Sequence, residues 1–119
     1  MTASSSTDLA SRIQRARVGG VERLTLLAGT SSACAIARDG GSFPAYKFHE
    51  GRVAAWGMAA KALRSGDEAP DAIARDLVTR WEEDVERRAT QGRDWQAYAA
   101  GGLDAARELA SWVGIADSS

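Results

Sequence analysis

Cysteine and histidine, the residues that supply most zinc ligands and many catalytic groups, are almost missing from this 119-residue sequence. Cys34 is the only cysteine, which excludes an internal disulfide and a cysteine zinc cluster. His49 is the only histidine, which excludes an H-E-x-x-H motif and a two-histidine metal site within one chain. We expect His49 to lie at the surface beside Glu50, and we expect neither a metal nor a cofactor.

Several motifs of enzymes are also missing. The sequence has no G-x-S-x-G nucleophile turn, no G-x-x-x-x-G-K phosphate loop and no G-x-G-x-x-G dinucleotide turn. It has no asparagine, and therefore no N-glycosylation site. These absences favour a non-enzymatic protein.

Long apolar runs and a strong charge of either sign are missing too. No run approaches the roughly 20 apolar residues that a membrane-spanning helix needs. The N-terminal sequence MTASSSTD lacks the charged-then-apolar pattern of a signal peptide. A formal net charge of −1 provides no broad attraction to nucleic acid or to an anionic membrane. We therefore expect a cytoplasmic protein with no membrane partner.

The composition is typical of helices, because alanine occupies 24 positions and proline only two. Apolar periodicity predicts three long helices, over about 44–64, 70–91 and 93–113. Short links between them favour a compact antiparallel helical bundle, with short N-terminal helices laid against it. The expected organisation is a flexible tail at 1–5, a single helical domain at 6–115, and a second flexible tail at 116–119.

The N-terminal third allows two interpretations. A first helix is expected from about Ser6 until Gly19-Gly20, a pair that commonly ends helices. Beyond it, the spacing of apolar residues favours two short helices. The same stretch also has the pattern of a short β-hairpin within 23–38, with strands at 24–27 and 33–37.

Residues 23–40 also have a partial resemblance in pattern to a helix-turn-helix, with Gly29 in the turn. Leu24 and Ala28 suit that pattern. Thr25 stands where a smaller residue would let the helices cross, and Arg38 stands where an apolar side chain is needed. The segment is thus a weak indication of a DNA-binding regulator.

The predicted helix at 44–64 has small residues along one side and an arginine in its apolar face. Gly51, Ala55 and Ala59 form a ridge that lets a neighbouring helix approach closely. Arg52 projects into the apolar face, where a charge must be paired or reach water.

Antiparallel pairing with the next helix places Arg52 near Asp84 and Arg88. One interpretation is a buried ion pair that fixes the helix register. The other is an anion-binding pocket, with Arg52 and Arg88 as a clamp that Asp84 orients.

Trp112 lies opposite the apolar stripe of its predicted helix, which makes it a candidate partner contact. The combined pattern favours a small cytoplasmic helical protein that acts by protein–protein interaction, including self-association. The alternatives are a DNA-binding regulator that uses residues 23–40 and a small-anion-binding domain at the cluster of Arg52, Asp84 and Arg88.

Overall fold

The computed structural model describes residues 2–28 and 43–115, with side chains from residue 8 onward. Within these ranges the chain forms helices and no strands, which confirms the prediction of a mainly helical protein. The expected second hairpin strand, the second half of the helix-turn-helix segment and the tail at 116–119 lie outside the described residues. The helices are α1 (Thr2–Ala28), α3 (Pro44–Ser65), α4 (Pro70–Arg87) and α5 (Arg93–Trp112).

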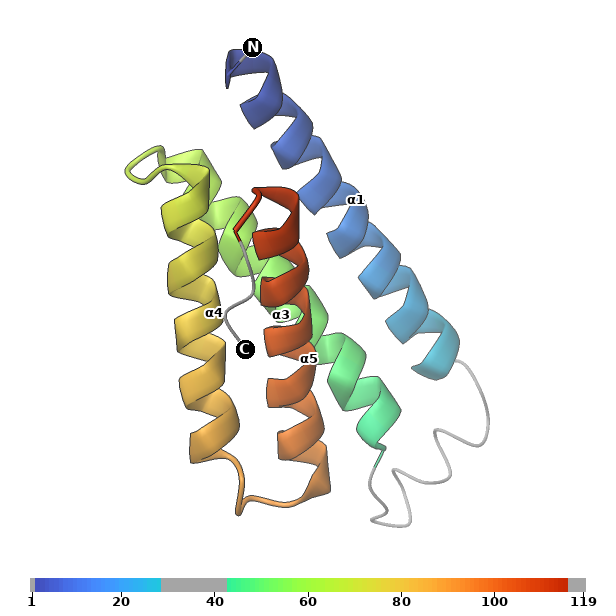
Figure 1. Ribbon diagram of the computed structural model, residues 1–119. Coiled ribbons are helices and arrows are strands. Elements are labelled where there is room, and N and C mark those ends of the chain that lie inside the picture. The colour runs from blue at the N-terminus through green and yellow to red at the C-terminus, as the bar shows by residue number, and fades with distance from the viewer. Residues whose placement is uncertain (1, 29–42, 116–119) are drawn as a thin grey trace.

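The four helices pack side by side, and each runs in the opposite direction to the one before it in the chain (Figure 1). α3 packs most extensively against α5, and the two helices run in the same direction. α1 packs on α3, and α4 packs on α5. α3 and α4 are consecutive in sequence but contact each other little.

The expectation that the first helix stops at Gly19-Gly20 is wrong, because α1 continues through both glycines to Ala28. Neither glycine has the positive φ of a helix cap. Gly20 instead lies against α3, where a β-carbon would stand 2.6 Å from Cγ2 of Val53. The glycine therefore allows close packing. The expected first helix and the start of the segment after it thus form one helix of 27 residues, and the second short helix expected before residue 38 lies outside the described residues.

The first half of the expected hairpin is also helical, because residues 23–28 belong to α1. The hydroxyl of Thr25 donates to the carbonyl of Val21, one helical turn earlier, at 3.0 Å. The alternation of Leu24-Thr25-Leu26 is also typical of a strand, because so short an apolar sequence fits both the two-residue period of a strand and the 3.6-residue period of a helix.

The ends of the other helices follow local signals. Proline occupies the first position of α3 and of α4, where its missing N–H leaves no bond unmade. Gly66 ends α3 in the left-handed conformation, with φ 73°. α4 ends at Arg87, earlier than the expected residue 91, because the chain from Arg88 turns toward Gly92.

The core lies between the inner sides of all four helices and is built mainly from alanine, leucine, isoleucine and tryptophan. Trp56, Ile13 and Leu109 are the largest side chains that are almost fully buried. The whole cluster of buried hydrophobic residues comprises Leu9, Ile13, Ala55, Trp56, Ala59, Ile73, Ala74, Leu77, Trp81, Ala105, Ala106, Leu109 and Ala110.

Candidate functional site

Asp84 is the one buried charged residue in the described chain, with 7% of its surface exposed. Arg87 donates to its Oδ1, and Nε of Arg88 donates to its Oδ2 at 2.8 Å. Asp84 and Arg87 lie in the last turn of α4, and Arg88 is the residue that follows its end. Their spacings of three and four residues place the three side chains on one side of the helix end. The structure thus brings Asp84 and Arg88 together and adds Arg87, which the sequence analysis did not include.

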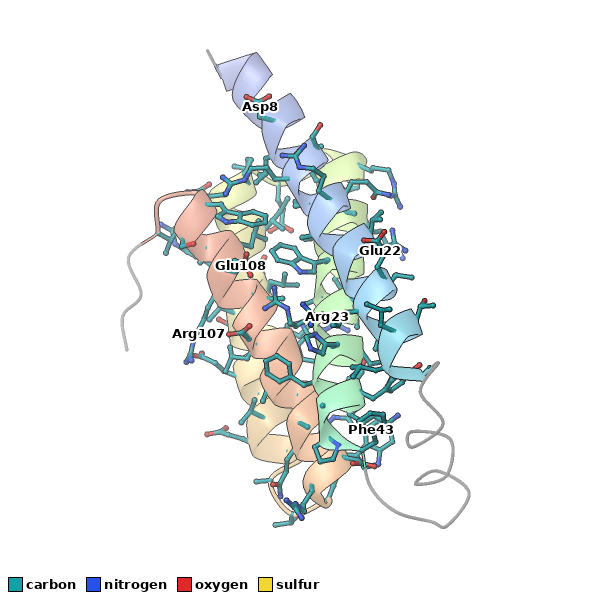
Figure 2. All side chains as sticks on the ribbon, turned by 90° about the vertical axis from the view of Figure 1, so that its right-hand side faces the viewer. Asp8, Glu22, Arg23, Phe43, Arg107 and Glu108 are labelled. Atoms are coloured by element: carbon teal, nitrogen blue, oxygen red, sulfur yellow. The ribbon has the colours of Figure 1, made fainter. Side chains whose placement is uncertain are left out.

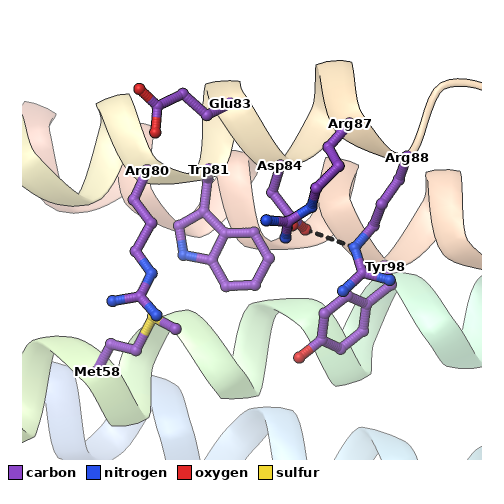
Figure 3. A pocket seen from close by; sticks show the side chains of 8 residues that line it. All are labelled: Met58, Arg80, Trp81, Glu83, Asp84, Arg87, Arg88 and Tyr98. Carbon is purple, nitrogen blue, oxygen red and sulfur yellow. Dashed lines mark hydrogen bonds and ion pairs between the residues drawn. The ribbon is translucent and has the colours of Figure 1, made fainter.

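These residues line a pocket of about 340 Å³ between α4, α3 and α5, which we call the α4 pocket (Figure 3). That volume suits a small ligand. Three arginines and two carboxylates line it, which leaves one net positive charge. The lining residues are Met58, Arg80, Trp81, Glu83, Asp84, Arg87, Arg88 and Tyr98.

Trp81 contributes an unsatisfied hydrogen-bond donor to this wall. Its side chain is buried, with 3% exposed, and its Nε1 has no hydrogen-bond partner among the described residues. Figure 3 shows the indole nitrogen on the side of the ring that faces Arg80 and Met58. A buried donor without an acceptor costs about 1–3 kcal/mol, so an acceptor from a ligand would recover that energy.

The position of the Trp81 ring depends on Gly102 of α5. A β-carbon at residue 102 would overlap the indole ring, so only glycine leaves room for it. Trp81 also contacts the Tyr98 ring, with 5.7 Å between ring centroids. The ring is thereby held between α4 and α5.

Arg88 connects the α4 pocket with an aromatic surface. Its guanidinium lies 5.4 Å from the ring centroid of Tyr98 and 4.7 Å from that of Trp95. Lys47 of α3 lies 5.0 Å from the Trp95 ring centroid. Nε of Arg88 donates to Asp84, and its two terminal nitrogens donate to no described residue, so they are available as donors.

Arg80 is a further donor of the pocket. It is exposed and makes no ion pair with any described residue. Asp76 lies four residues before Arg80, a spacing that allows an ion pair in a helix, but none forms between them. Sequence spacing alone does not distinguish an unpaired arginine from a paired one.

The structure does not place Arg52 in this cluster, which corrects the expected pairing with Asp84. Arg52 donates to Asp104 and, at 2.6 Å, to Glu108. Both acids lie on α5, because α3 packs mainly against α5 and has little contact with α4. Arg52 is thus an interhelical ion-pair residue, and Arg80 and Arg87 join Arg88 in the pocket. Asp104 and Glu108 are four residues apart, and neither is followed by an arginine four residues later on the same helix. This lack of a local partner is a signal in the sequence that could have identified them as the partners of Arg52.

His49 lies partly buried on α3, close to the Arg52 ion pairs. Its burial, together with the positive charges of Arg23 and Arg52, lowers its pKa from the ordinary value of 6.5. The imidazole is therefore mainly neutral near pH 7. The expected surface position is only partly correct.

Trp112 is held by contacts within the chain. Its ring stacks on Trp56, with 4.9 Å between centroids and an interplanar angle of 15°. The guanidinium of Arg12 on α1 lies 4.2 Å from the centroid of Trp112. Trp95 is the more exposed tryptophan, with 42% of its surface accessible.

The described residues contain no group of three or more His, Cys, Asp or Glu side chains that could hold a metal ion. None of the described helices is both long and apolar enough to cross a membrane. Of the helix-turn-helix segment, residues 23–28 form the end of α1.

Comparison with known proteins provides no family for this chain. No protein-family model matches the sequence, and neither a curated protein nor a solved structure matches it. The α4 pocket must therefore be interpreted from its own chemistry.

Proposed function

We propose that this chain is a non-enzymatic binding protein whose α4 pocket receives an oxyanion, meaning a carboxylate or a phosphate, either free or carried by a partner protein. The observation that carries the proposal is the unpartnered indole N–H of Trp81 beside a cluster of arginines. An oxyanion can accept hydrogen bonds from the indole and from guanidinium groups at the same time.

The arrangement around Asp84 supports binding rather than catalysis. Its carboxylate accepts from Arg87 and Arg88 and therefore orients these groups. Guanidinium groups stay protonated at physiological pH and serve as donors and as positive charges. The end of Arg80 and the thioether of Met58 are flexible, so both can move aside to expose the indole nitrogen.

Arg80 and Arg88 take the place of the expected clamp of Arg52 and Arg88, and Asp84 stays the orienting group. Interaction with an acidic segment of another protein uses the same chemistry as a free anion. A cytoplasmic location stays a prediction from the sequence.

Thermal unfolding in the presence of inorganic phosphate, acetate or a short acidic peptide tests the proposal, with sodium chloride at equal ionic strength as reference. A ligand at ten times its Kd stabilises the folded chain by about 1.4 kcal/mol. In a domain of this size that corresponds to an increase in Tm of about 4–8 °C. An increase with phosphate or acetate identifies a free anion as sufficient, and an increase with the peptide alone identifies a partner protein.

Variants of α4 locate the binding site. Arg80→Gln removes an unpaired guanidinium, and Trp81→Phe removes the indole N–H while keeping an aromatic ring. Both should reduce the anion-induced increase in Tm. Arg75→Gln is the matched control, because Arg75 is exposed on the same helix and outside the pocket. The proposal fails if no anion raises Tm above the chloride reference, or if Arg80→Gln responds like the wild type.

A further inference from the structure

α1 lies at the edge of the helix assembly, where it packs on α3, and exposes apolar residues to solvent. Of the four exposed large hydrophobic residues in the described chain, three lie on α1. Val18 and Val21 each have 46% of their surface exposed, and Leu26 has 69%. Exposed apolar residues that cluster on one helix are typical of a surface that contacts a partner.

The exposed side of α1 also carries one positive and one negative residue at matching positions. Arg15 and Glu22 are seven residues apart, which is about two turns and returns to the same side of the helix. Both are exposed, and neither makes an ion pair with a described residue. In Figure 2, Arg23 extends from α1 toward α5, whereas Glu22 points away from α5. We define the outer face of α1 as Ser11, Arg15, Val18, Glu22 and Leu26.

We propose that the outer face of α1 binds a second copy of this chain, with the two α1 helices antiparallel about a two-fold axis. We place the axis midway between Val18 and Gly19. Each residue then faces the residue of the second copy that lies equally far from the axis in the sequence, so that the two residue numbers add up to 37. Arg15 then faces Glu22 of the second copy, and Glu22 faces its Arg15. Two reciprocal ion pairs form, as two-fold symmetry requires.

The residues at and beyond the axis fit the same arrangement. Val18 faces Gly19 of the second copy, where a β-carbon would meet no atom of the described residues within 4 Å, so space is open for the valine side chain. Leu26, at the C-terminal end of the face, lies opposite the small Ser11. Gly19 is the one glycine inside a described helix at which an added β-carbon would have no described residue packed within 4 Å, and a close contact with a second copy accounts for it.

Charge complementarity favours a second copy over an unrelated protein. Arg15 and Glu22 lie about 5 Å along the helix on either side of the proposed axis. Their opposite charges make the face complementary to itself. A single pair of helices buries less than the roughly 1,200–2,000 Å² of stable interfaces. The dimer should therefore dissociate in the micromolar range.

Sedimentation equilibrium of the full chain, from about 1 µM to about 1 mM, measures the association. We expect the wild-type chain to pass from monomer to dimer. Glu22→Arg and Arg15→Glu each place like charges opposite one another twice, and each should weaken dimerisation roughly tenfold or more. Glu86→Arg is the matched control, because Glu86 is exposed on α4 and makes no ion pair with a described residue; this variant should dimerise like the wild type.

Two rescue experiments make the geometry specific. The double variant with Arg15→Glu and Glu22→Arg restores both ion pairs and should recover dimerisation. Mixing the two single variants should also produce heterodimers, because each Glu then faces an Arg. Circular dichroism of every variant checks that the helices remain folded.

Three results would overturn the proposal. They are a wild-type chain that stays monomeric at every concentration, a dimer that Glu22→Arg leaves unchanged, and a double variant that does not recover. The first of these would leave the face to another partner. None of them affects anion binding at the α4 pocket, whose residues lie on other helices.

Discussion

Gly51 of α3 lies against the backbone carbonyl of Tyr98 on α5, so closely that a β-carbon at residue 51 would overlap the carbonyl oxygen. The relationship is reciprocal, because a β-carbon at Gly101 of α5 would overlap the carbonyl of Phe48 on α3. The two backbones therefore touch at two successive levels. This contact sets the spacing of the helices on which the core and the α4 pocket depend.

Gly51→Ala should destabilise the fold. Alanine favours the helix by about 1 kcal/mol over glycine, but overpacking against a backbone that cannot move aside costs about 1–3 kcal/mol or more. We expect a net loss in the free energy of unfolding, measured by urea denaturation. Gly57→Ala, on the same helix, meets only the Arg17 side chain at 3.9 Å and should be neutral or stabilising. Equal effects of the two substitutions would contradict the close contact.

The elements that the sequence predicted well depend on local signals. Pro44 and Pro70 begin α3 and α4 because proline fixes φ and has no N–H. Gly66 ends α3 because glycine, without a β-carbon, readily adopts the positive φ of a helix cap. The ridge of Gly51, Ala55 and Ala59 indicated a close helix neighbour, and these three residues are buried.

The features that the sequence did not predict depend on which helices become neighbours. A glycine pair inside a helical pattern is indistinguishable from a helix end until the opposing residue is known, and at Gly20 that residue is Val53. The partner of Arg52 likewise depends on the packing of α3 against α5 and not against α4. That packing follows from the close contact of Gly51 and Gly101 with the backbone of the opposite helix. Asp84 and Arg88 were found together because their spacing of four residues on one helix is a local signal.

Arg52→Ala should lower the free energy of unfolding by about 1 kcal/mol, because it removes two ion pairs between α3 and α5 whose acids are partly exposed. A double-mutant cycle with Glu108→Ala measures the coupling between the two side chains. The anion-induced increase in Tm should be unchanged in Arg52→Ala, since Arg52 does not line the α4 pocket. If the anion no longer raises the Tm of Arg52→Ala, Arg52 contributes to anion binding.

His49 should make stability depend on pH in one direction. Its pKa is lowered by burial and by Arg23 and Arg52, so the unfolded chain takes up a proton before the folded chain does. The stabilising contribution is fully present above about pH 6.5 and is lost as the pH falls through the lowered pKa of the folded state. Urea denaturation at about pH 8 and about pH 5 should therefore show a smaller difference for His49→Gln than for the wild type. A difference of equal size in both proteins would exclude this contribution.

Trp112→Ala should cost about 2–4 kcal/mol of stability, because it removes the ring stacked on Trp56 and leaves a cavity beside it. It also removes the surface under the guanidinium of Arg12. Trp95→Ala is the comparison, and its greater exposure predicts a smaller loss in the same urea titration. If Trp112→Ala leaves stability intact, the ring is free to serve as a partner contact after all.

Asp84→Asn should change stability and anion binding in opposite directions. Without an anion, the variant loses the charge that neutralises Arg87 and Arg88, and we expect a loss of about 1–3 kcal/mol, limited by the exposure of Arg87. The amide oxygen of asparagine still accepts from the arginines and keeps them oriented, but the pocket gains one net positive charge, so with phosphate the increase in Tm should exceed that of the wild type. The same phosphate titration, followed by thermal unfolding, measures both effects. A variant that loses stability and also fails to respond to phosphate would show that Asp84 and its arginines form a structural ion pair. In a binding site, the arginines would still donate to phosphate after the charge of Asp84 is removed.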